Sequence, residues 1–462
     1  MFFQSFFDDK LAQYSYLIGC QRTGESIVID PSRHYKNILA VAKKQGLTIT
    51  AAAETHIHAD FISGSRQLAN DLQVKLFLSD EGDVDWKYQY TNNLNVELVK
   101  DGSKFSIGKV DFEVIHTPGH TPESISFILT DRGGGATSPM GIFTGDFVFV
   151  GDVGRPDLLE KAVGVKNSAG IGARQMFDSL KRFKELPDYL MVWPSHGAGS
   201  ACGKSLGAIP SSTVGYEKMF NWALNIDDED LFVKELLKDQ PEAPTYFSEM
   251  KKANKMGPTI LKEKTSEYIT SSTDIEKLLS NKQVIIIDTR DANIAEKSLL
   301  PGSINIPFSK SFVNWAGWLI KYDEDIVLVA ETAQLHEIIK ALQSIHLDDV
   351  KGIILPENIE SFEKVSYDTI DVEQFKNEAS DQYIMDIRNN SEWKNGHIEN
   401  ANHHFLGHLR TTTLDREMPI YLHCQSGVRS AIGASVLKSL GFKEIKHLAG
   451  GYNAYQKEGI KK

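Results

Sequence analysis

The sequence predicts an α/β protein of several domains, and three observations support this fold class. The chain has 462 residues, and at about 150 residues per domain this length suggests roughly three domains. From residue 14 to residue 225, short β-type runs alternate with helical stretches, as in α/β domains. Further along, residues 284–308 and 383–405 form a weak internal repeat. Such a repeat predicts two domains of one kind.

Composition and charge exclude several classes of protein. Hydrophobic residues make up 41% of the chain and charged residues 24%, which is too apolar for a disordered protein and too often interrupted by charge for a membrane span. The 62 acidic and 50 basic residues give a net charge of -12, which disfavours binding to nucleic acid or to an anionic membrane. Small molecules are therefore the expected partners.

The start of the chain and its cysteines predict where the protein works. The apolar first residues are followed by Asp8 and Asp9 before the first lysine, so the positively charged segment that opens a secretory signal is missing. Cys20, Cys202 and Cys424 are far apart and form no CxxC pair, which supports neither a disulfide framework nor a cysteine zinc site. We expect a cytoplasmic protein in which each cysteine needs its own explanation.

The first predicted domain covers residues 1–225, and a linker follows it. Strands are expected at the runs "SIVID", "KLFLS", "FEVIH", "GIFTGDFVFV" and "YLMVWPSH", with helices over residues 34–45 and 172–184. In this kind of domain, reactive side chains lie at strand ends. Residues 226–264 are charged and contain three prolines, which predicts one amphipathic helix followed by an irregular linker.

Two smaller domains are predicted after the linker, over residues 265–360 and 361–462. Each copy of the repeat has a buried-type strand, an Asp-x-Arg turn, a loop and a second short strand. The turns begin at Asp288 and Asp386. Another apolar strand and a helix follow in each copy. Strand alternating with helix predicts a small parallel sheet flanked by helices in each domain.

Metal-ligand residue types gather in the first domain. His56, His58 and Asp60 alternate directly after an apolar run, so an extended backbone presents all three to one side at a strand end. The turn "TPGHT" presents His120, and Asp146 ends a buried strand. Two imidazoles and one carboxylate can occupy one face of an octahedral metal and leave three positions for water, O2 and substrate, as in ferrous oxygenases. Zinc is the competing metal, because the same ligands suit it.

These motifs, at residues 56–60, 120, 146 and 196, resemble those of the metallo-β-lactamase superfamily. Within it, the string "ETHIHADF…TPGHTPES…TGDFVFVGDVGRPD…PSHGAG" is similar to the persulfide dioxygenase branch. The resemblance implies an αββα sandwich. It also implies one mononuclear, non-heme Fe(II) held by His56, His120 and Asp146.

Phe61 distinguishes this chain from the hydrolases that it resembles. Those enzymes usually have a histidine directly after the aspartate of their first motif, where it helps to hold a second metal, and this chain has Phe61 there. A phenyl ring cannot bind a metal. The resemblance therefore favours one iron over two zinc ions. It leaves three residues as candidates for substrate binding or for support of the metal ligands: His58, Asp60 and His196.

Two further residues near these motifs each have two interpretations. Arg155, in "GDVGRPD", is either a structural ion-pair residue or, by similarity to the dioxygenases, a residue that binds the thiol carrier of the substrate. Cys202 follows His196 in a loop of small residues. It is either a buried apolar side chain or a catalytic thiol that handles sulfur. Cys20 ends an early strand, and core packing is its expected role.

The second motif is "LHCQSGVRSAIGASVL", in the second copy of the repeat. Cys424 follows a buried strand, Gly427 permits a tight loop, Arg429 closes it, and a helix is expected from Ser430. Backbone N–H groups, a helix N-terminus and an arginine favour a thiolate and cradle an anion. Cysteine phosphatases have one residue more between cysteine and arginine than sulfurtransferases, and this chain has the shorter spacing, with residues 425–428 between them. The segment therefore resembles the active loop of a rhodanese, with Cys424 and Arg429 as catalytic residues.

The first copy of the repeat looks like a degenerate rhodanese. Aligning its strands puts Glu331 where Cys424 lies and removes the glycine and the arginine. A carboxylate cannot carry sulfane sulfur, so a structural role is expected for this copy. The fold class that both resemblances imply is an N-terminal metallo-β-lactamase αββα sandwich followed by two tandem rhodanese-like α/β domains.

Joined in one chain, the two motifs imply a persulfide dioxygenase and rhodanese fusion that detoxifies sulfide. A low-molecular-weight thiol persulfide would be oxidised with O2 to sulfite, and Cys424 would pass sulfane sulfur from a second persulfide to sulfite, giving thiosulfate; the reverse flow uses the same residues. The thiol carrier (glutathione, coenzyme A, bacillithiol or cysteine) stays open, as does a homo-oligomer. The alternatives are a dinuclear zinc thioester hydrolase of the glyoxalase II type with an accessory rhodanese module, and a non-enzymatic sulfur carrier or sensor.

Overall fold

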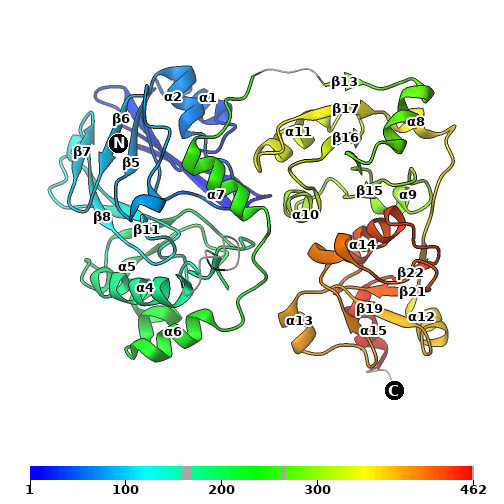
Figure 1. Ribbon diagram of the computed structural model, residues 1–462. Helices are drawn as coiled ribbons and strands as arrows, with labels where there is room; N and C mark the ends of the chain where they lie inside the picture. Colours follow the sequence, from blue (N-terminus) through cyan, green and yellow to red (C-terminus); the bar gives the residue numbers. More distant parts are fainter. Residues whose placement is uncertain (159, 161–167, 205, 263–265, 460–462) are drawn as a thin grey trace. The chain divides into compact units, whose positions relative to one another are not determined.

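The structure is a computed structural model that describes residues 1–158, 160, 168–204, 206–262 and 266–459 (Figure 1). The chain forms two compact units. The first consists of Met1–Lys262 with Gln343–His346, and the second of Glu263–Leu342 with Leu347–Lys462. Among the described residues, no helix is both long and apolar enough to cross a membrane.

Two six-stranded sheets form the first unit. The strands of the first sheet follow the order of the chain: β1 (Phe2–Asp8), β2 (Gln13–Gly19), β3 (Glu25–Ile29), β4 (Thr48–Ala53), β5 (Lys75–Ser79) and β6 (Val96–Val99). The strands of the second sheet run in reverse order: β12 (Ser212–Thr213), β11 (Met191–Pro194), β10 (Gly141–Gly145), β9 (Ile125–Asp131), β8 (Val110–His116) and β7 (Lys104–Ile107). The first sheet is parallel from β3 to β6, and β10 pairs in parallel with β11.

Apolar side chains of both sheets meet in one core. Tyr16 and Ile27 of the first sheet belong to the same buried cluster as Phe112, Phe127 and Phe143 of the second. This core arises because alternate residues of a strand point to opposite faces. Cys20 lies in the same cluster, which is the core position that the sequence indicates.

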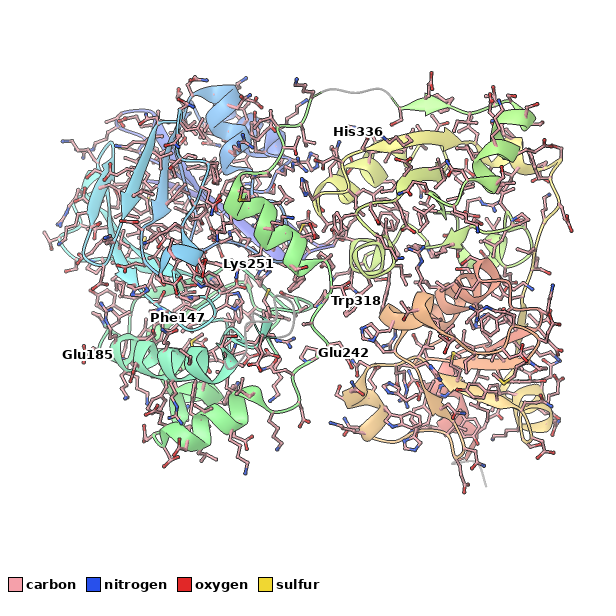
Figure 2. All side chains as sticks on the ribbon, in the orientation of Figure 1. Phe147, Glu185, Glu242, Lys251, Trp318 and His336 are labelled. Carbon is pink, nitrogen blue, oxygen red and sulfur yellow. The ribbon has the colours of Figure 1, made fainter. Side chains whose placement is uncertain are left out.

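Helices cover the outer faces of the two sheets (Figure 1). On the first sheet, α1 (Lys36–Lys44) and α2 (Ser65–Leu72) contribute Ile38 and Leu68 to a second buried cluster. On the second sheet, α4 (Ser168–Lys184) contributes Met176 to a third cluster, which also holds Phe147, labelled in Figure 2. The order helix, sheet, sheet, helix confirms the expected αββα sandwich.

The segment predicted as a linker, residues 226–264, differs from that prediction up to Lys262. It contains two helices, α6 (Glu229–Leu237) and α7 (Phe247–Met256), and the first unit includes both. The reason is apolar burial, since Phe232 and Leu236 of α6 enter the cluster beside α4. The short elements of this unit are η1 (Val84–Trp86), η2 (Arg132–Gly134), α5 (Val214–Phe220) and η3 (Trp222–Asn225).

The second unit contains two five-stranded parallel sheets with the same topology. The middle lobe has the order β13 (Glu267–Tyr268), β17 (Val350–Ile354), β16 (Asp325–Val329), β14 (Val284–Asp288) and β15 (Ile304–Asn305). The C-terminal lobe has the order β18 (Asp368–Ile370), β22 (Ile445–Leu448), β21 (Ile420–His423), β19 (Tyr383–Asp386) and β20 (Asn402–His403). In each lobe the first strand pairs with the fifth, so the internal repeat of the sequence corresponds to a repeated sheet.

Helices flank both sheets, as the alternating pattern predicts. The middle lobe has α8 (Ser272–Ser280), α9 (Ala292–Ala295), α10 (Phe312–Leu319), α11 (Leu335–Gln343) and η4 (Pro356–Ile359). The C-terminal lobe has α12 (Val372–Glu378), α13 (Asn390–Lys394), η5 (Leu406–Thr411), α14 (Val428–Ser439) and α15 (Gly451–Gly459).

The two lobes pack directly against each other. The backbone N–H of Asn305 donates to Ser435 Oγ of α14 at 2.9 Å, and Trp318, labelled in Figure 2, has its ring centroid 5.0 Å from that of Phe405. Leu299 and Val365 form an isolated antiparallel bridge. The middle lobe therefore supplies part of the surface that buries α14.

Candidate functional site

The predicted metal ligands follow strands at one edge of the sandwich. His56 comes shortly after β4, and Asp146 directly after β10. His120 lies in the segment between β8 and β9, where Gly119 has a φ of 149° and a Cβ would come within 2.7 Å of Met176. Only glycine fits that position without strain. The backbone therefore brings His120 to the strand ends that carry the other two residues.

His56, His120 and Asp146 are buried, and one potential ligand atom of each lies within 4.8 Å of the others. The Nε2 atoms of His56 and His120 lie 3.9 Å and 3.4 Å from Asp146 Oδ2. His56 Nε2 and Asp146 Oδ2 have no hydrogen-bond partner among the described residues. Buried polar atoms without a partner are costly, and a cation between them would satisfy both.

The hydrogen bonds behind these histidines fix which ring nitrogen is available. Thr55 Oγ1 donates to Asp30 at 2.9 Å, so it must accept from His56 Nδ1–H at 3.0 Å. His120 Nδ1–H donates to the carbonyl oxygen of Arg155 at 2.9 Å. In both rings, Nε2 therefore keeps its lone pair and points at the cluster, which is the form that binds a metal.

The charge states of this cluster suit a cation as well. Burial lowers the pKa of His56 well below its usual value, and burial also lowers the pKa of His120, so both rings are neutral. Burial by itself would raise the pKa of Asp146, but His196, His56 and His120 hold it below its usual value. Two neutral imidazoles and one carboxylate are the protonation states that metal ligands need.

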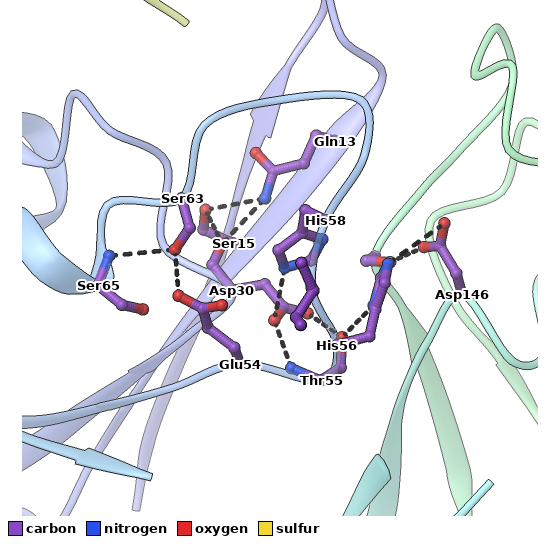
Figure 3. Close-up of polar contacts among 12 residues, drawn as sticks. Gln13, Ser15, Asp30, Glu54, Thr55, His56, His58, Ser63, Ser65 and Asp146 are labelled. Carbon is purple, nitrogen blue, oxygen red and sulfur yellow. Dashed lines mark hydrogen bonds and ion pairs between the residues drawn. The ribbon is translucent and has the colours of Figure 1, made fainter. Parts of the chain in front are cut away.

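His58 points away from this cluster and toward the end of β3 (Figure 3). Its Nε2 lies 3.1 Å from Asp30 Oδ1, and Asp30 also accepts from the backbone N–H of Thr55 at 2.8 Å. Burial would lower the pKa of His58, but Asp30, with smaller effects of Glu54 and Asp60, raises it to about 9. Sequence reasoning missed Asp30, although an aspartate that ends the apolar run "SIVID" is a signal that could have found it.

A second group of donor atoms lies beside the first. Asp60, His196 and Cys202 are buried, with one ligand atom of each within 4.8 Å of the others. His196 Nε2 lies 3.1 Å from Asp60 Oδ2 and 3.5 Å from Asp146 Oδ1. Its Nδ1–H donates to the carbonyl oxygen of Ala12 at 3.1 Å. Phe61 cannot bind a metal. Asp60, His196 and Cys202 nevertheless bring a carboxylate, an imidazole and a thiol together beside the first group.

Burial determines the state of the Cys202 thiol. Only 1% of Cys202 is exposed. Burial raises the pKa of its thiol well above the usual value, and Asp60 and Asp146 raise it further. The thiol is therefore neutral unless a cation lies beside it.

Arg155 lies in the interior, and its guanidinium forms an ion pair. It is 0% exposed, and its Nε and Nη2 atoms donate to the two carboxylate oxygens of Asp157 at 2.7 Å and 2.8 Å. Nη2 also donates to the carbonyl oxygen of Pro241 at 2.7 Å. This ion pair is one of the two interpretations of Arg155, and binding of the thiol carrier stays a prediction. Its carbonyl oxygen orients His120, a contact that sequence reasoning missed. Ser195 was missed too, and its hydroxyl donates to Asp146 Oδ1.

Cys424 lies in a second site, in the C-terminal lobe. It directly follows β21, and α14 begins at Val428, earlier than the expected Ser430. Its Sγ accepts from the backbone N–H groups of Gly427 at 3.2 Å and Ser430 at 3.3 Å. Gly427 has a φ of 94°, which favours glycine. The thiol thus sits at a helix N-terminus that stabilises negative charge.

Arg429, the residue predicted to close the loop, forms an ion pair with a neighbouring helix. Its Nη1 and Nη2 atoms donate to Glu392 of α13 at 2.7 Å and 2.6 Å. Arg388, in contrast, contacts the loop, since its Nη1 donates to Gln425 Oε1 at 2.9 Å. Glu392 and the loop contact of Arg388 were not predicted, because both depend on residues far apart in the sequence.

The middle lobe keeps the Asp-x-Arg ion pair but has no thiol. Arg290 donates to Asp288 as Arg388 donates to Asp386, with shortest distances of 2.6 Å and 2.7 Å. Glu331 follows β16 and is exposed. The three cysteines of the chain all lie elsewhere.

Comparisons with known proteins match two parts of the chain to families. Residues 8–196 match the family model described as metallo-beta-lactamase superfamily, and residues 371–458 match the model of the rhodanese-like domain. The crystal structure of a metallo-beta-lactamase from Staphylococcus aureus subsp. aureus COL is 45% identical, with a TM-score of 0.70; the match covers 77% of this chain and 99% of that one.

Curated relatives of the first unit carry more than one activity in their names. The mitochondrial persulfide dioxygenase ETHE1 of Bos taurus is 27% identical over 233 residues, which are 49% of this chain and 77% of that protein. The hydroxyacylglutathione hydrolase of Rhodospirillum rubrum is 30% identical over 185 residues, which are 40% of this chain and 61% of that protein. With its His and Asp metal-binding site, the chain belongs to the metallo-β-lactamase superfamily and also contains a C-terminal rhodanese-like domain.

Proposed function

We propose that this protein oxidises low-molecular-weight persulfides with O2 to sulfite at one Fe(II), and that Cys424 transfers sulfane sulfur to sulfite to give thiosulfate. The observation that carries the proposal is the pairing, in one chain, of a buried site of two histidines and one aspartate with a thiol cradled by backbone N–H groups. Relatives named persulfide dioxygenases support it.

The first site fits iron through His56, His120 and Asp146, whose available atoms converge. When bound there, ferrous iron supplies the electron-transfer chemistry that lets O2 react with a sulfur compound. Thr55 and the Arg155 carbonyl hold the two rings in the required tautomer, and Ser195 holds the carboxylate. The balanced reaction is RSSH + O2 + H2O → RSH + sulfite + two protons.

We further propose that Asp60, His196 and Cys202 line the position of the persulfide. Cys202 is buried beside the carboxylates of Asp60 and Asp146, so its neutral S–H can donate toward the anionic sulfur of a persulfide. The lone pair on His196 Nε2 can accept a proton. These residues would thereby hold the substrate next to the metal ligands.

In the C-terminal lobe, the thiolate of Cys424 would attack the outer sulfur of RSSH. The S–S bond breaks, RS⁻ leaves, and Cys424 carries a persulfide, which loses its proton. Sulfite then attacks the outer sulfur, thiosulfate leaves and the thiolate returns. The N–H groups of Gly427 and Ser430 stabilise the anionic sulfur in both steps.

A dinuclear thioester hydrolase is the second candidate, and the group of Asp60, His196 and Cys202 favours it because a second metal could bind there. Relatives named hydroxyacylglutathione hydrolases point the same way. Metal content separates the two functions, since the first needs one iron and the second needs two zinc ions.

The test is anaerobic purification of the full chain, followed by metal analysis and activity assays. We expect one iron per chain, O2 uptake with the persulfide of glutathione, coenzyme A, bacillithiol or cysteine, and multiple turnover. Two tightly bound zinc ions with release of thiol from a thioester would overturn the proposal. Binding of a single sulfur atom without turnover would indicate a carrier or sensor instead.

A further inference from the structure

Ser430 connects the Cys424 thiol to a hydrogen-bonded chain that leaves the active loop. The backbone N–H of Ser430 donates to Cys424 Sγ at 3.3 Å. Its hydroxyl donates to the carbonyl oxygen of Gly427 at 3.0 Å and lies 3.2 Å from His447 Nδ1. Ser430 is fully buried, so these contacts determine where its hydroxyl points.

The chain continues from His447 into the middle lobe. His447 Nε2 lies 2.8 Å from Thr369 Oγ1, and Thr369 Oγ1 donates to Glu296 Oε2 at 2.5 Å. Thr369 belongs to β18, whereas Glu296 directly follows α9. The middle lobe, which has no cysteine, thus supplies Glu296, the last group in the series of hydrogen bonds that begins at the Cys424 thiol.

The chemistry of these groups determines which group donates and which accepts in each hydrogen bond. A carboxylate only accepts, so the Thr369 hydroxyl donates to Glu296 and its oxygen must accept from His447 Nε2–H. Burial lowers the pKa of His447 to about 4, although Glu296 opposes this shift. The ring is therefore neutral and its Nδ1 carries no proton, so the Ser430 hydroxyl can share its one proton between Nδ1 and the Gly427 carbonyl oxygen.

Backbone contacts between the lobes hold Glu296 in place. Leu299 and Val365 exchange backbone hydrogen bonds of 3.1 Å and 2.9 Å, and the N–H of Tyr367 donates to the carbonyl oxygen of Glu296 at 3.2 Å. The Glu296 side chain is 17% exposed. It lines a polar cavity of about 580 Å³ together with Thr369 and Glu378.

We propose that Glu296 of the middle lobe is a positioning residue for the Cys424 loop, because it fixes the His447 tautomer through Thr369 and thereby the orientation of Ser430. The proposal rests on the proposed sulfur transfer at Cys424. Without Glu296 or the Thr369 hydroxyl, the ring is free to move its proton to Nδ1 and donate to the Ser430 oxygen, and the hydroxyl proton of Ser430 then stays with the Gly427 carbonyl oxygen alone.

The test uses the full chain with histidine labelled by 15N. Glu296→Ala and Thr369→Val interrupt the hydrogen bonds between Glu296 and His447, whereas Thr369→Ser keeps the hydroxyl. Glu378→Ala is the matched control, since Glu378 lines the same cavity but accepts from Lys446 and Tyr421. The His447 signal, assigned with His447→Gln, is expected to change from the Nε2–H to the Nδ1–H form in the first two variants only.

Kinetics provide the second readout. For sulfur transfer from a persulfide to sulfite, we expect kcat to fall about fivefold in Glu296→Ala and Thr369→Val, the size of one ordinary hydrogen bond, with KM unchanged and Thr369→Ser close to the unmodified protein. The rate at which iodoacetamide alkylates Cys424, measured on its peptide by mass spectrometry, should change in the same two variants.

An unchanged His447 tautomer in Glu296→Ala and Thr369→Val would overturn the proposal, and so would an equal loss of kcat in Glu378→Ala. Absence of sulfur transfer in the unmodified chain would instead overturn the proposed function. In that case, the tautomer and the alkylation rate still decide whether Glu296 controls the loop, because neither depends on turnover.

Discussion

Single hydrogen bonds behind the metal centre decide which imidazole atom faces it. His56, His120 and His196 each direct Nδ1 to an oxygen atom outside the cluster: the Thr55 hydroxyl, the Arg155 carbonyl and the Ala12 carbonyl. The lone pairs of their Nε2 atoms therefore point into the cluster before a cation binds. Such preorganisation means that a change one residue behind a ligand should reduce metal affinity without removing a ligand.

His120 is one of the two imidazole ligands proposed for the metal. His120→Ala removes one of two imidazoles, so the purified variant should lose iron and O2 uptake, as measured by metal analysis and an oxygen electrode. His116→Ala is the matched control, because His116 lies at the end of β8 and its Nε2 contacts the Pro122 carbonyl oxygen instead. Full activity in His120→Ala would show that His120 does not bind the catalytic metal.

Asp30 lies behind the metal ligands. It accepts from the backbone N–H and the hydroxyl of Thr55 and contacts His58. Asp30→Asn places an amide N–H against one of these donors, so iron affinity should fall by roughly 10–100-fold, the usual effect of losing a group that orients a ligand. Metal titration checks this, with the partly exposed Asp111→Asn as control. Equal affinity in both variants would show that Asp30 does not orient the site.

At the scale of secondary-structure elements, two glycines shape the loop between β21 and α14. Gly427 allows the turn that points two N–H groups at Cys424 Sγ. Gly451, at the start of α15, has a φ of 57°, and a Cβ there would lie 2.4 Å from the Cys424 carbonyl oxygen. The active loop therefore depends on the close approach of α15 as well as on its own residues.

Gly451→Ala should consequently impair sulfur transfer. A β-carbon on a residue with a left-handed backbone destabilises the fold by about 1–2 kcal/mol. At Gly451 the added β-carbon would also collide with the Cys424 carbonyl oxygen, so the loop must move. Gly441→Ala isolates the first effect, because Gly441 has a φ of 88° and nothing within 4 Å of its added Cβ. Urea unfolding should show that both variants lose stability through the left-handed backbone. Transfer assays should show that only Gly451→Ala loses sulfur transfer. Equal transfer in the two variants would refute the packing argument.

For the molecule as a whole, the sequence predicts the elements and motifs better than the contacts between them. The run "SIVID" becomes β3, and the expected helix over residues 172–184 lies within α4. Local periodicity and spacing carry that information. Arg155 and Cys202 each allowed two interpretations, because burial and partners such as Asp157 depend on how distant segments meet.

The middle lobe remains a predicted rhodanese-like domain without a catalytic thiol. Glu331→Ala should leave sulfur transfer within twofold of the unmodified chain, since Glu331 is exposed and no sulfur can bind it covalently. Deleting residues 270–355 should instead reduce solubility, because it removes the residues that contact Ser435 and Phe405. Soluble yield and transfer assays test both changes. Sulfur transfer by the isolated middle lobe would contradict this division.

The most direct test of the account is the product formed per O2 by the full chain and by Cys424→Ser. Cys424 lies outside the metal-binding unit, so O2 uptake with a persulfide should be nearly equal in the two proteins. The unmodified chain should form thiosulfate, whereas Cys424→Ser should accumulate sulfite. No O2 uptake in the iron-loaded unmodified chain, or equal thiosulfate from both proteins, would contradict the proposed division of labour.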